Sequence, residues 1–293
     1  MALALPVLLA AILDPRIPPL LERVTEEARV FTERCQKFVG VEKLTQKGRI
    51  APPRFRLRKG AQASEVPAIA YRTTELMSEY GFGRLPGLGG EVKEIRLVTA
   101  VNGRPVRDRP AARLQLAEGM DSDMDRLTKQ MLQDMEAYGM VGAVTDMGQM
   151  LMLFNRTRLG DFDFTMLPDT IRDGEPVAVL TYRQSGGEAA TRVYHREVAR
   201  IPISGELWIR RASGQPLRIT AELPLKEGKF AVVHSLSVDY AQSPQGVMLP
   251  SRAAYSRRQD SVLMVETEAV YSDFKMFSAE AEIKFLAADE PEK

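Results

Sequence analysis

The sequence predicts a mainly β protein of the α+β class, built on one large, curved antiparallel sheet with two to three helices on its concave face. Three observations carry this prediction. The chain after Gly160 is a series of short segments in which apolar and polar residues alternate, as in half-buried strands. Two regions before it repeat apolar residues at helical spacing. Connections are short, so about eleven antiparallel strands form a sheet that must curl, and the helices cover its hollow side.

The composition excludes several classes of protein. Of the 293 residues, 44% are hydrophobic and 27% are charged, which is ordinary for a globular chain and excludes disorder or a multi-spanning membrane protein. The 40 Lys+Arg and 39 Asp+Glu residues nearly cancel, so no basic surplus favours nucleic acid as a partner. Cys35 is the single cysteine, which excludes an intrachain disulfide and a cysteine-only metal site.

The N-terminus carries an uncharged apolar run at residues 2–13. Its length suits the core of a signal peptide and is too short to span a bilayer. No Lys or Arg precedes the run, and the cleavage-site candidates are poor. Two interpretations of residues 1–19 therefore stay open, a signal-like leader or a buried or frayed N-terminal segment. The first predicts a periplasmic or secreted protein.

Three regions are expected to be helical. Residues 20–38 place apolar side chains every three to four positions between charged ones, which is typical of an amphipathic helix. Residues 120–138 predict the strongest helix, with acidic residues at its start that suit the helix dipole. Residues 144–154 have the same spacing over a shorter, methionine-rich stretch.

Strands are expected over most of the remaining chain. Residues 66–80 and 91–101 read as strands separated by a glycine-rich stretch, and Asn102-Gly103 is a strong turn signal. The other segments with the pattern of strands are 39–50, 162–166, 177–183, 206–210, 217–223, 230–240, 247–258, 262–273 and 276–285.

Several phrases of the chain are similar to those of known proteins: residues 101–108 (VNGRPVRD), 205–209 (GELWI) with 213–218 (SGQPLR), and 271–274 (YSDF). Together they resemble uncharacterised secreted bacterial proteins. The order of the last three phrases also resembles the LolA-like superfamily of lipoprotein localisation factors. That resemblance implies an unclosed antiparallel half-barrel with an apolar cavity under its helices, which carries lipids or lipoprotein acyl chains in the bacterial envelope.

The superfamily resemblance covers mainly residues 160–286. Two regions depart from it, an insert at about residues 76–109 and the methionine-rich helices at about residues 120–154. We therefore expect a single LolA-like domain over residues 20–286 that contains both departures. Residues 287–293 are expected to form a disordered tail.

Methionines cluster in the two helical regions before Gly160. Thioethers are flexible and polarizable, so a surface lined by them adapts to varied apolar ligands such as acyl chains. The alternative is that they fill gaps in an ordinary core. On the first interpretation, the residues expected to line a cavity are Met124, Leu127, Met131, Met135, Tyr138, Met147, Leu151, Phe154, His234 and Tyr240.

A local basic run precedes the glycine-rich stretch. Positive charge there suits contact with anionic lipid headgroups at a membrane surface or with a phosphorylated partner, and the alternative is a solvated loop or a charged edge strand. The residues assigned to headgroup or surface contact are Arg54, Arg56, Arg58 and Lys59.

Motifs for catalysis are absent from the sequence. His195, His234 and Cys35 lie in separate elements, so a catalytic zinc is not expected. There is no Gly-x-Ser-x-Gly elbow, and the glycine-rich stretch lacks the Lys and Ser/Thr of a phosphate loop. The acidic residues at the start of the 120–138 helix lack the glycine and bidentate glutamate of a calcium loop. We expect no catalytic residue, no cofactor and no metal.

Three functions remain in order of preference. The first is non-enzymatic binding or carriage of a lipophilic ligand, a lipid or lipoprotein acyl chain, in the bacterial envelope. The second is a structural or protein-interaction module of the envelope with a filled core and no small-molecule ligand. The third is a hydrolase that uses His195 or His234. A cavity under the helices distinguishes the first function from the second.

Overall fold

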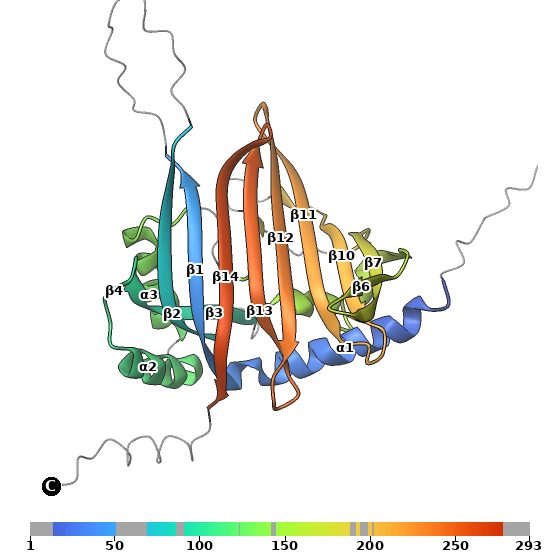
Figure 1. Ribbon diagram of the computed structural model, residues 1–293, viewed down its shortest axis with the longest axis horizontal. Helices are drawn as coiled ribbons and strands as arrows, with labels where there is room; N and C mark the ends of the chain where they lie inside the picture. Colours follow the sequence, from blue (N-terminus) through green and yellow to red (C-terminus); the bar gives the residue numbers. More distant parts are fainter. Residues whose placement is uncertain are drawn as a thin grey trace, which may run out of the picture.

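A computed structural model describes residues 14–50, 69–85, 91–122, 124–141, 145–187, 192–193, 199–200 and 202–277. Its main feature is a twelve-stranded antiparallel sheet in the order β4-β3-β2-β1-β14-β13-β12-β11-β10-β7-β5, with β6 paired to β7 (Figure 1). The two ends of this order are not paired with each other among the described strands, so the sheet is not closed into a barrel. This confirms the mainly β fold class expected from the sequence.

The described chain contains the following elements: α1 (Ile17–Arg34), η1 (Cys35–Lys37), β1 (Phe38–Arg49), β2 (Tyr71–Leu85), β3 (Glu91–Val101), β4 (Arg104–Pro105), α2 (Arg109–Ser122), α3 (Met124–Ala137), η3 (Met150–Phe154), η4 (Leu159–Asp161), β5 (Phe162–Met166), β6 (Thr170–Arg172), β7 (Glu175–Gln184), β8 (Arg192–Val193), β9 (Ala199–Arg200), β10 (Ser204–Arg210), β11 (Pro216–Glu227), β12 (Phe230–Gln242), β13 (Met248–Gln259) and β14 (Val262–Met276). The short strands β8 and β9 form a separate pair.

Tight turns join neighbouring strands of the sheet. Asn102 and Gly103, between β3 and β4, have φ angles of 48° and 77°. Two consecutive residues with positive φ are the mark of a type I′ hairpin turn, whose twist matches that of the strands. Asp260 and Ser261 make the same kind of turn between β13 and β14, with φ angles of 47° and 69°.

Helix α1 runs across the strands at one end of the sheet (Figure 1). Prolines in its first turn suit a helix start, because the amide hydrogens there have no partner within the helix. Its apolar stripe packs on η3 and β13, and Phe31 meets Phe82 of β2 edge to face at 5.1 Å between ring centroids. We call the face of the sheet that α1 covers the inner face, and the opposite one the outer face.

Helices α2 and α3 lie on the outer face, at the edge formed by β2 and β3. Tyr80 and Phe82 of β2 belong to the cluster beneath α1. Gly81 and Gly83 alternate with them and leave room for Met120 and Met124 of α2 and α3. The helices therefore divide between the two faces, whereas the sequence placed all of them on one.

Three segments differ from the expected elements. The helix expected at residues 120–138 begins earlier, at Arg109, as α2 and continues as α3. The helix expected at residues 144–154 is reduced to the 3₁₀ turn of η3. The last expected strand, at 276–285, falls almost wholly outside the described residues, since β14 ends at Met276.

No helix in the described ranges combines the length and apolar character that a membrane crossing requires. The N-terminal run at residues 2–13 lies outside those ranges. The same holds for the basic residues Arg54, Arg56, Arg58 and Lys59 and for His195.

Candidate functional site

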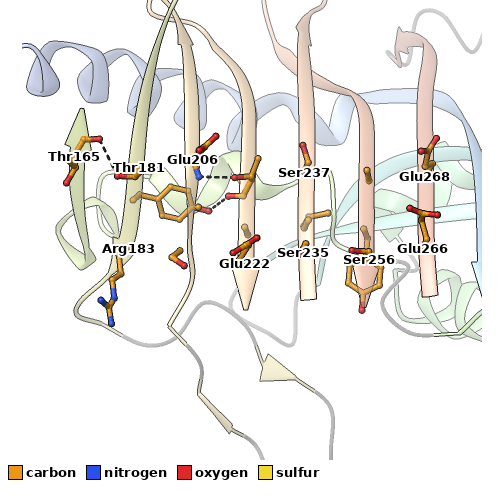
Figure 2. Close-up of a pocket in the computed structure, with 18 of the residues that line it drawn as sticks. Thr165, Thr181, Arg183, Glu206, Glu222, Ser235, Ser237, Ser256, Glu266 and Glu268 are labelled. Atoms are coloured by element: carbon orange, nitrogen blue, oxygen red, sulfur yellow. Dashed lines mark hydrogen bonds between the residues drawn. The ribbon is translucent and has the colours of Figure 1, made fainter. Parts of the chain in front are cut away.

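The outer face carries a polar groove over β5, β7 and β10 to β14 (Figure 2). Its volume is about 900 Å³, and serine, threonine and glutamate side chains make up most of its lining. None of the ten residues expected to line an apolar cavity belongs to this lining. An apolar ligand site is therefore to be sought on the inner face.

The structure separates the expected cavity residues into two groups. Met147, Leu151, Phe154 and Tyr240 belong to the large cluster of the inner face. Met135 joins this cluster from the C-terminal end of α3, and Tyr138, just after the helix, packs against it. Met124, Leu127 and Met131 belong to a second cluster, formed by α2 and α3 on the outer face. Because the sheet lies between these clusters, one ligand does not reach both.

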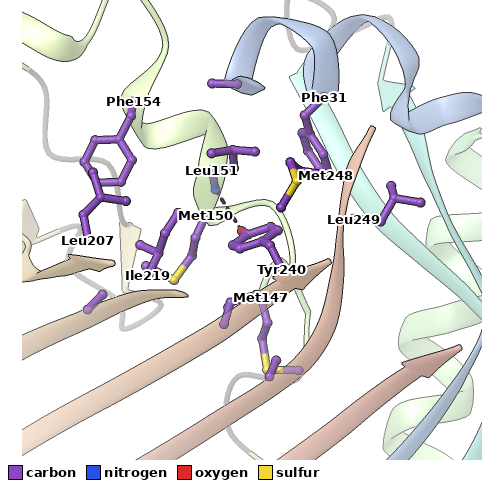
Figure 3. Packing of buried hydrophobic residues seen from close by; sticks show 14 of the residues in the cluster. Phe31, Met147, Met150, Leu151, Phe154, Leu207, Ile219, Tyr240, Met248 and Leu249 are labelled. Carbon is purple, nitrogen blue, oxygen red and sulfur yellow. Dashed lines mark hydrogen bonds between the residues drawn. The ribbon is translucent and has the colours of Figure 1, made fainter. Parts of the chain in front are cut away.

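The inner-face group centres on residues 145–154, which we call the inner segment. Met147, Leu151 and Phe154 are 2%, 0% and 0% exposed, and they pack with Tyr240, Met248 and Ile219 of the sheet beneath α1 (Figure 3). The methionine-rich stretch is therefore part of a well-packed interior.

Polar contacts to two buried side chains hold the inner segment. The Gly148 amide donates a hydrogen bond to Oε1 of Glu94. The Tyr240 hydroxyl donates to the Gly148 carbonyl at 2.9 Å. It also accepts from the Leu151 amide at 2.9 Å (Figure 3). A Cβ on Gly148 would lie 2.8 Å from Pro250 and from the Tyr80 hydroxyl. Only glycine allows the backbone to approach these groups so closely.

A cluster of charges lies beneath the inner segment. Arg96 of β3 is fully buried, with its Nε 2.9 Å from Oε2 of Glu42 on β1 and its Nη2 3.1 Å from Oε2 of Glu94 on β3. The Tyr80 hydroxyl donates to Oε1 of Glu94 at 2.7 Å. The guanidinium carbon also lies 5.7 Å from the centroid of the Tyr80 ring.

Two carboxyl groups and one guanidinium leave one negative charge without compensation in this cluster. Burial is the main cause that raises the pKa of Glu42, and the neighbouring Glu94 adds to it, while Arg96 opposes the rise. The resulting pKa of Glu42 is about 7. Burial likewise raises the pKa of Glu94. Since a lone buried negative charge is costly, the cluster holds one proton up to about neutral pH.

The hydroxyls of Ser78 and Tyr271 lie beside Glu42 in the interior. The Tyr271 hydroxyl favours the ionised form of Glu42 and so opposes the rise of its pKa. The Ser78 hydroxyl has no hydrogen-bond partner within the described residues. Glu42 is the cross-strand neighbour of both Ser78 and Tyr271, so the three lie together on the inner face. An unsatisfied buried hydroxyl of this kind is rare in native proteins.

Sequence reasoning missed the Glu42, Glu94 and Arg96 cluster. A signal for it was present, because Glu42 shares a strand face with Leu44, and Arg96 shares one with Val98. Charged residues at core positions of alternating strands are expected to form ion pairs with one another. Pairing them required the register between β1, β2 and β3, which the sequence does not contain.

His234 lies on the inner face of β12 and is half-buried. Its Nδ1 is 2.8 Å from the Tyr255 hydroxyl, and its Nε2 has no hydrogen-bond partner. Burial, with the nearby Arg257, lowers the pKa of this imidazole. Within the described ranges it therefore contacts a tyrosine and no serine or cysteine of a nucleophile–base pair.

Other reactive groups are sparse among the described residues. No three His, Cys, Asp or Glu side chains gather there as a set of metal ligands. Burial raises the pKa of the Cys35 thiol to about 12, so it is not a nucleophile near neutral pH. What the inner-face site offers is an apolar, methionine-bearing interior with a buried, protonatable charge cluster.

Comparisons with known proteins find likenesses among solved structures alone. No family model matches the chain. No curated protein matches it either. A LolA superfamily protein from Nitrosomonas europaea is 14% identical, with 90% of this chain and 96% of that one covered and a TM-score of 0.32. A domain named for outer membrane lipoprotein sorting, from Vibrio parahaemolyticus, is 13% identical, with 91% and 97% covered and a TM-score of 0.39. A DUF1329 family protein from Desulfovibrio piger is 10% identical, with 89% and 93% covered and a TM-score of 0.34.

Identities of 10% to 14% leave the ligand of this chain to be argued from its own residues.

Proposed function

We propose that this protein binds and carries a lipophilic ligand, such as a lipid or an acyl chain, in the bacterial envelope without transforming it. The ligand would lie between the inner face of the sheet and its cover of α1 and the inner segment. The observation that carries the proposal is the construction of this cover. One helix and a short 3₁₀ turn cover the apolar side chains of β11 to β13, and methionines supply much of the contact.

Entry of a ligand requires the inner segment to move, because the interior is packed. Moving it breaks three hydrogen bonds, from Gly148 to Glu94 and between Tyr240 and the segment, each of which contributes about 1 kcal/mol net. Each methylene transferred from water to an apolar interior gains about 0.8 kcal/mol. About four methylenes therefore offset the loss of these bonds. The flexible side chains of Met147, Met150 and Met248 suit repacking around such a chain.

The envelope location rests on the signal-like run at residues 2–13. The basic residues Arg54, Arg56, Arg58 and Lys59 are proposed to add attraction to an anionic membrane surface.

A second candidate is favoured by the packing itself. Met147, Leu151 and Phe154 are almost completely buried by the chain itself. A filled interior is what a protein-interaction module of the envelope requires, with its contacts on other surfaces. The two candidates differ in whether the inner segment opens.

The deciding experiment is native mass spectrometry of the protein purified gently from a bacterial envelope, with organic extraction of any bound molecule. A stoichiometric lipid supports carriage and names its class. A mass equal to that of the chain alone, unchanged after incubation with mixed phospholipid vesicles, refutes carriage and favours the interaction module.

Two neighbouring alanines of β13 provide matched variants. Ala253 is fully buried in the inner-face cluster, whereas Ala254 lies in the outer groove. Ala253→Leu takes up space at the proposed site and is expected to reduce uptake of a fluorescent fatty acid at least tenfold. Ala254→Leu is expected to leave uptake unchanged. Circular dichroism of both variants checks that they fold. Equal uptake by folded Ala253→Leu would place the ligand elsewhere.

A further inference from the structure

The floor of the outer groove consists of two adjacent rows of side chains that cross the strands. The pairing registers of β5, β7 and β10 to β14 place one residue of each strand in each row. The first row is Thr165, Thr181, Glu206, Thr220, Ser237, Ala254 and Glu268, and the second is Asp163, Arg183, Ser204, Glu222, Ser235, Ser256 and Glu266.

Most side chains of these two rows are small, and a row of large side chains stands beside them. The two rows therefore form the floor of a groove. Trp208, Arg218, Asp239 and Arg252 are successive cross-strand neighbours in that row. Arg218 donates two hydrogen bonds to Asp239, at 2.6 and 2.8 Å, and its guanidinium carbon lies 5.7 Å from the Trp208 ring centroid. These contacts make a fixed wall along one side of the groove.

Negative charge gathers at two places in the groove. Glu206 and Glu222 lie on neighbouring strands at one place, and Glu266 and Glu268 lie two residues apart on β14 at the other. Glu206 accepts a hydrogen bond from Trp208 at 2.8 Å, and Glu268 pairs with Arg252 at 3.1 Å. Arg183 is the one basic residue of the lining, and Lys47 on β1 is the cross-strand neighbour of Glu266.

The second row presents two glutamates that form no ion pair within the described ranges. They are Glu222 and Glu266, and both are exposed. Ser235 and Ser256 separate them across the sheet (Figure 2). Strands lie about 4.8 Å apart, so three steps from β11 to β14 separate the two backbones by about 14 Å. An extended chain advances about 3.4 Å per residue and covers this distance in four to five residues.

The floor strands β11, β12 and β13 are each paired on both sides. They therefore offer no free edge to which another strand adds. A ligand of this groove is recognised through the carboxylates and hydroxyls of the floor. The groove is long. The negative charge at its two acidic places is complementary to a ligand with two separated cations.

We propose that the outer groove binds an extended, basic polypeptide segment with two Lys or Arg residues four to five positions apart. One cation pairs with Glu222 and Glu206, and the other with Glu266 and Glu268. The hydroxyls of Ser235 and Ser256 hydrogen-bond to the peptide between them. This site is separate from the proposed lipophilic site, which lies on the opposite face of the same strands.

The test uses fluorescein-labelled peptides of glycine and serine with two lysines at separations of two to eight residues. Fluorescence anisotropy with the full chain measures their affinities at low salt. We expect the tightest binding at separations of four to five residues, at least tenfold tighter than that of a peptide with one lysine. Equal affinities at all separations would overturn the proposal, because they indicate general attraction between opposite charges.

Matched double variants locate the site. Glu222→Gln with Glu266→Gln is expected to lower the affinity for the best peptide to that for the one-lysine peptide. Glu22→Gln with Glu136→Gln changes the net charge equally at exposed helical positions and is expected to leave the affinity within twofold. A comparable loss of affinity in both double variants would refute binding of the peptide in the groove.

Two further measurements distinguish this proposal from a polyamine site and from the proposed lipophilic site. Spermine supplies separated cations without a peptide chain, and tighter binding of spermine than of the best peptide would replace the proposed partner by a polyamine. Fatty-acid uptake by the Glu222→Gln, Glu266→Gln variant is expected to equal that of the unaltered chain. A parallel loss of uptake would contradict the separation of the two sites.

Discussion

Glu42 and Glu94 share one guanidinium, that of Arg96, in the interior of the sheet. All three side chains are fully buried. The pair of carboxyl groups is therefore linked electrostatically, and ionisation of both leaves a net negative charge in an apolar surrounding. The stability of the fold depends on pH through this cluster, and the inner segment depends on it through Gly148.

The first prediction concerns this pH dependence. The pKa of Glu42 is raised from 4.5 to about 7 in the folded chain, so the folded state holds a proton that the unfolded state has already lost between these values. Its contribution to stability is complete below pH 4.5 and is lost as the pH rises to 7, by about 3 kcal/mol. Glu42→Gln removes this dependence. Urea unfolding between pH 4.5 and 7.5 measures it.

The control for that experiment is Glu22→Gln, at an exposed position of α1. It is expected to give a stability curve parallel to that of the unaltered chain. If the Glu42→Gln curve were also parallel, the cluster would not titrate in this range.

The second prediction concerns the hydrogen bonds between Tyr240 and the inner segment. Tyr240→Phe removes the hydroxyl that bonds Gly148 and Leu151 and leaves two buried backbone groups unpaired, at a cost of about 1–3 kcal/mol. We expect faster amide hydrogen exchange over residues 145–154, measured by mass spectrometry. Tyr182→Phe is the matched control, because this equally buried hydroxyl bonds Thr220 instead. The same increase in both variants would argue against a specific anchor.

A third prediction follows from the close approach of β10 and β11. A Cβ on Gly205 would overlap the backbone carbonyl of Thr220, which cannot move without breaking strand pairing. Gly205→Ala is expected to lower the unfolding free energy by about 3 kcal/mol or more. Gly160→Ala meets no atom within 4 Å and is expected to change it by less than about 1 kcal/mol. Chemical denaturation of both variants tests this, and similar midpoints would contradict the close approach.

The fourth prediction tests the position of α3 on the outer face. Leu127 is fully buried against β3 and α2, whereas Leu132 on the same helix is 55% exposed. Leu127→Ala is expected to lower the free energy of unfolding by about 2–5 kcal/mol because it leaves a cavity. Leu132→Ala is expected to change the free energy of unfolding by less than about 0.5 kcal/mol. Thermal unfolding of the pair is sufficient, and a small effect at Leu127 would show that the helix does not pack there.

The kind of fold could be predicted from local patterns in the sequence. Alternation of apolar and polar residues identifies a strand without reference to its neighbours, because side chains of successive residues point to opposite faces. The expected strands at 230–240 and 247–258 agree with β12 and β13, and Asn102-Gly103 forms the expected turn. These features are local, so a single segment of sequence contains the information for them.

Which elements pack against one another could not be predicted from these local patterns. Met124 and Met147 are equally apolar, yet they lie on opposite faces of the sheet, because helical spacing shows that a face is buried but not what buries it. The cluster of Glu42, Glu94 and Arg96 and the two glutamates of the groove arise from the registers of neighbouring strands. Register depends on pairing between segments far apart in the chain, and a shift of one residue reverses every side chain.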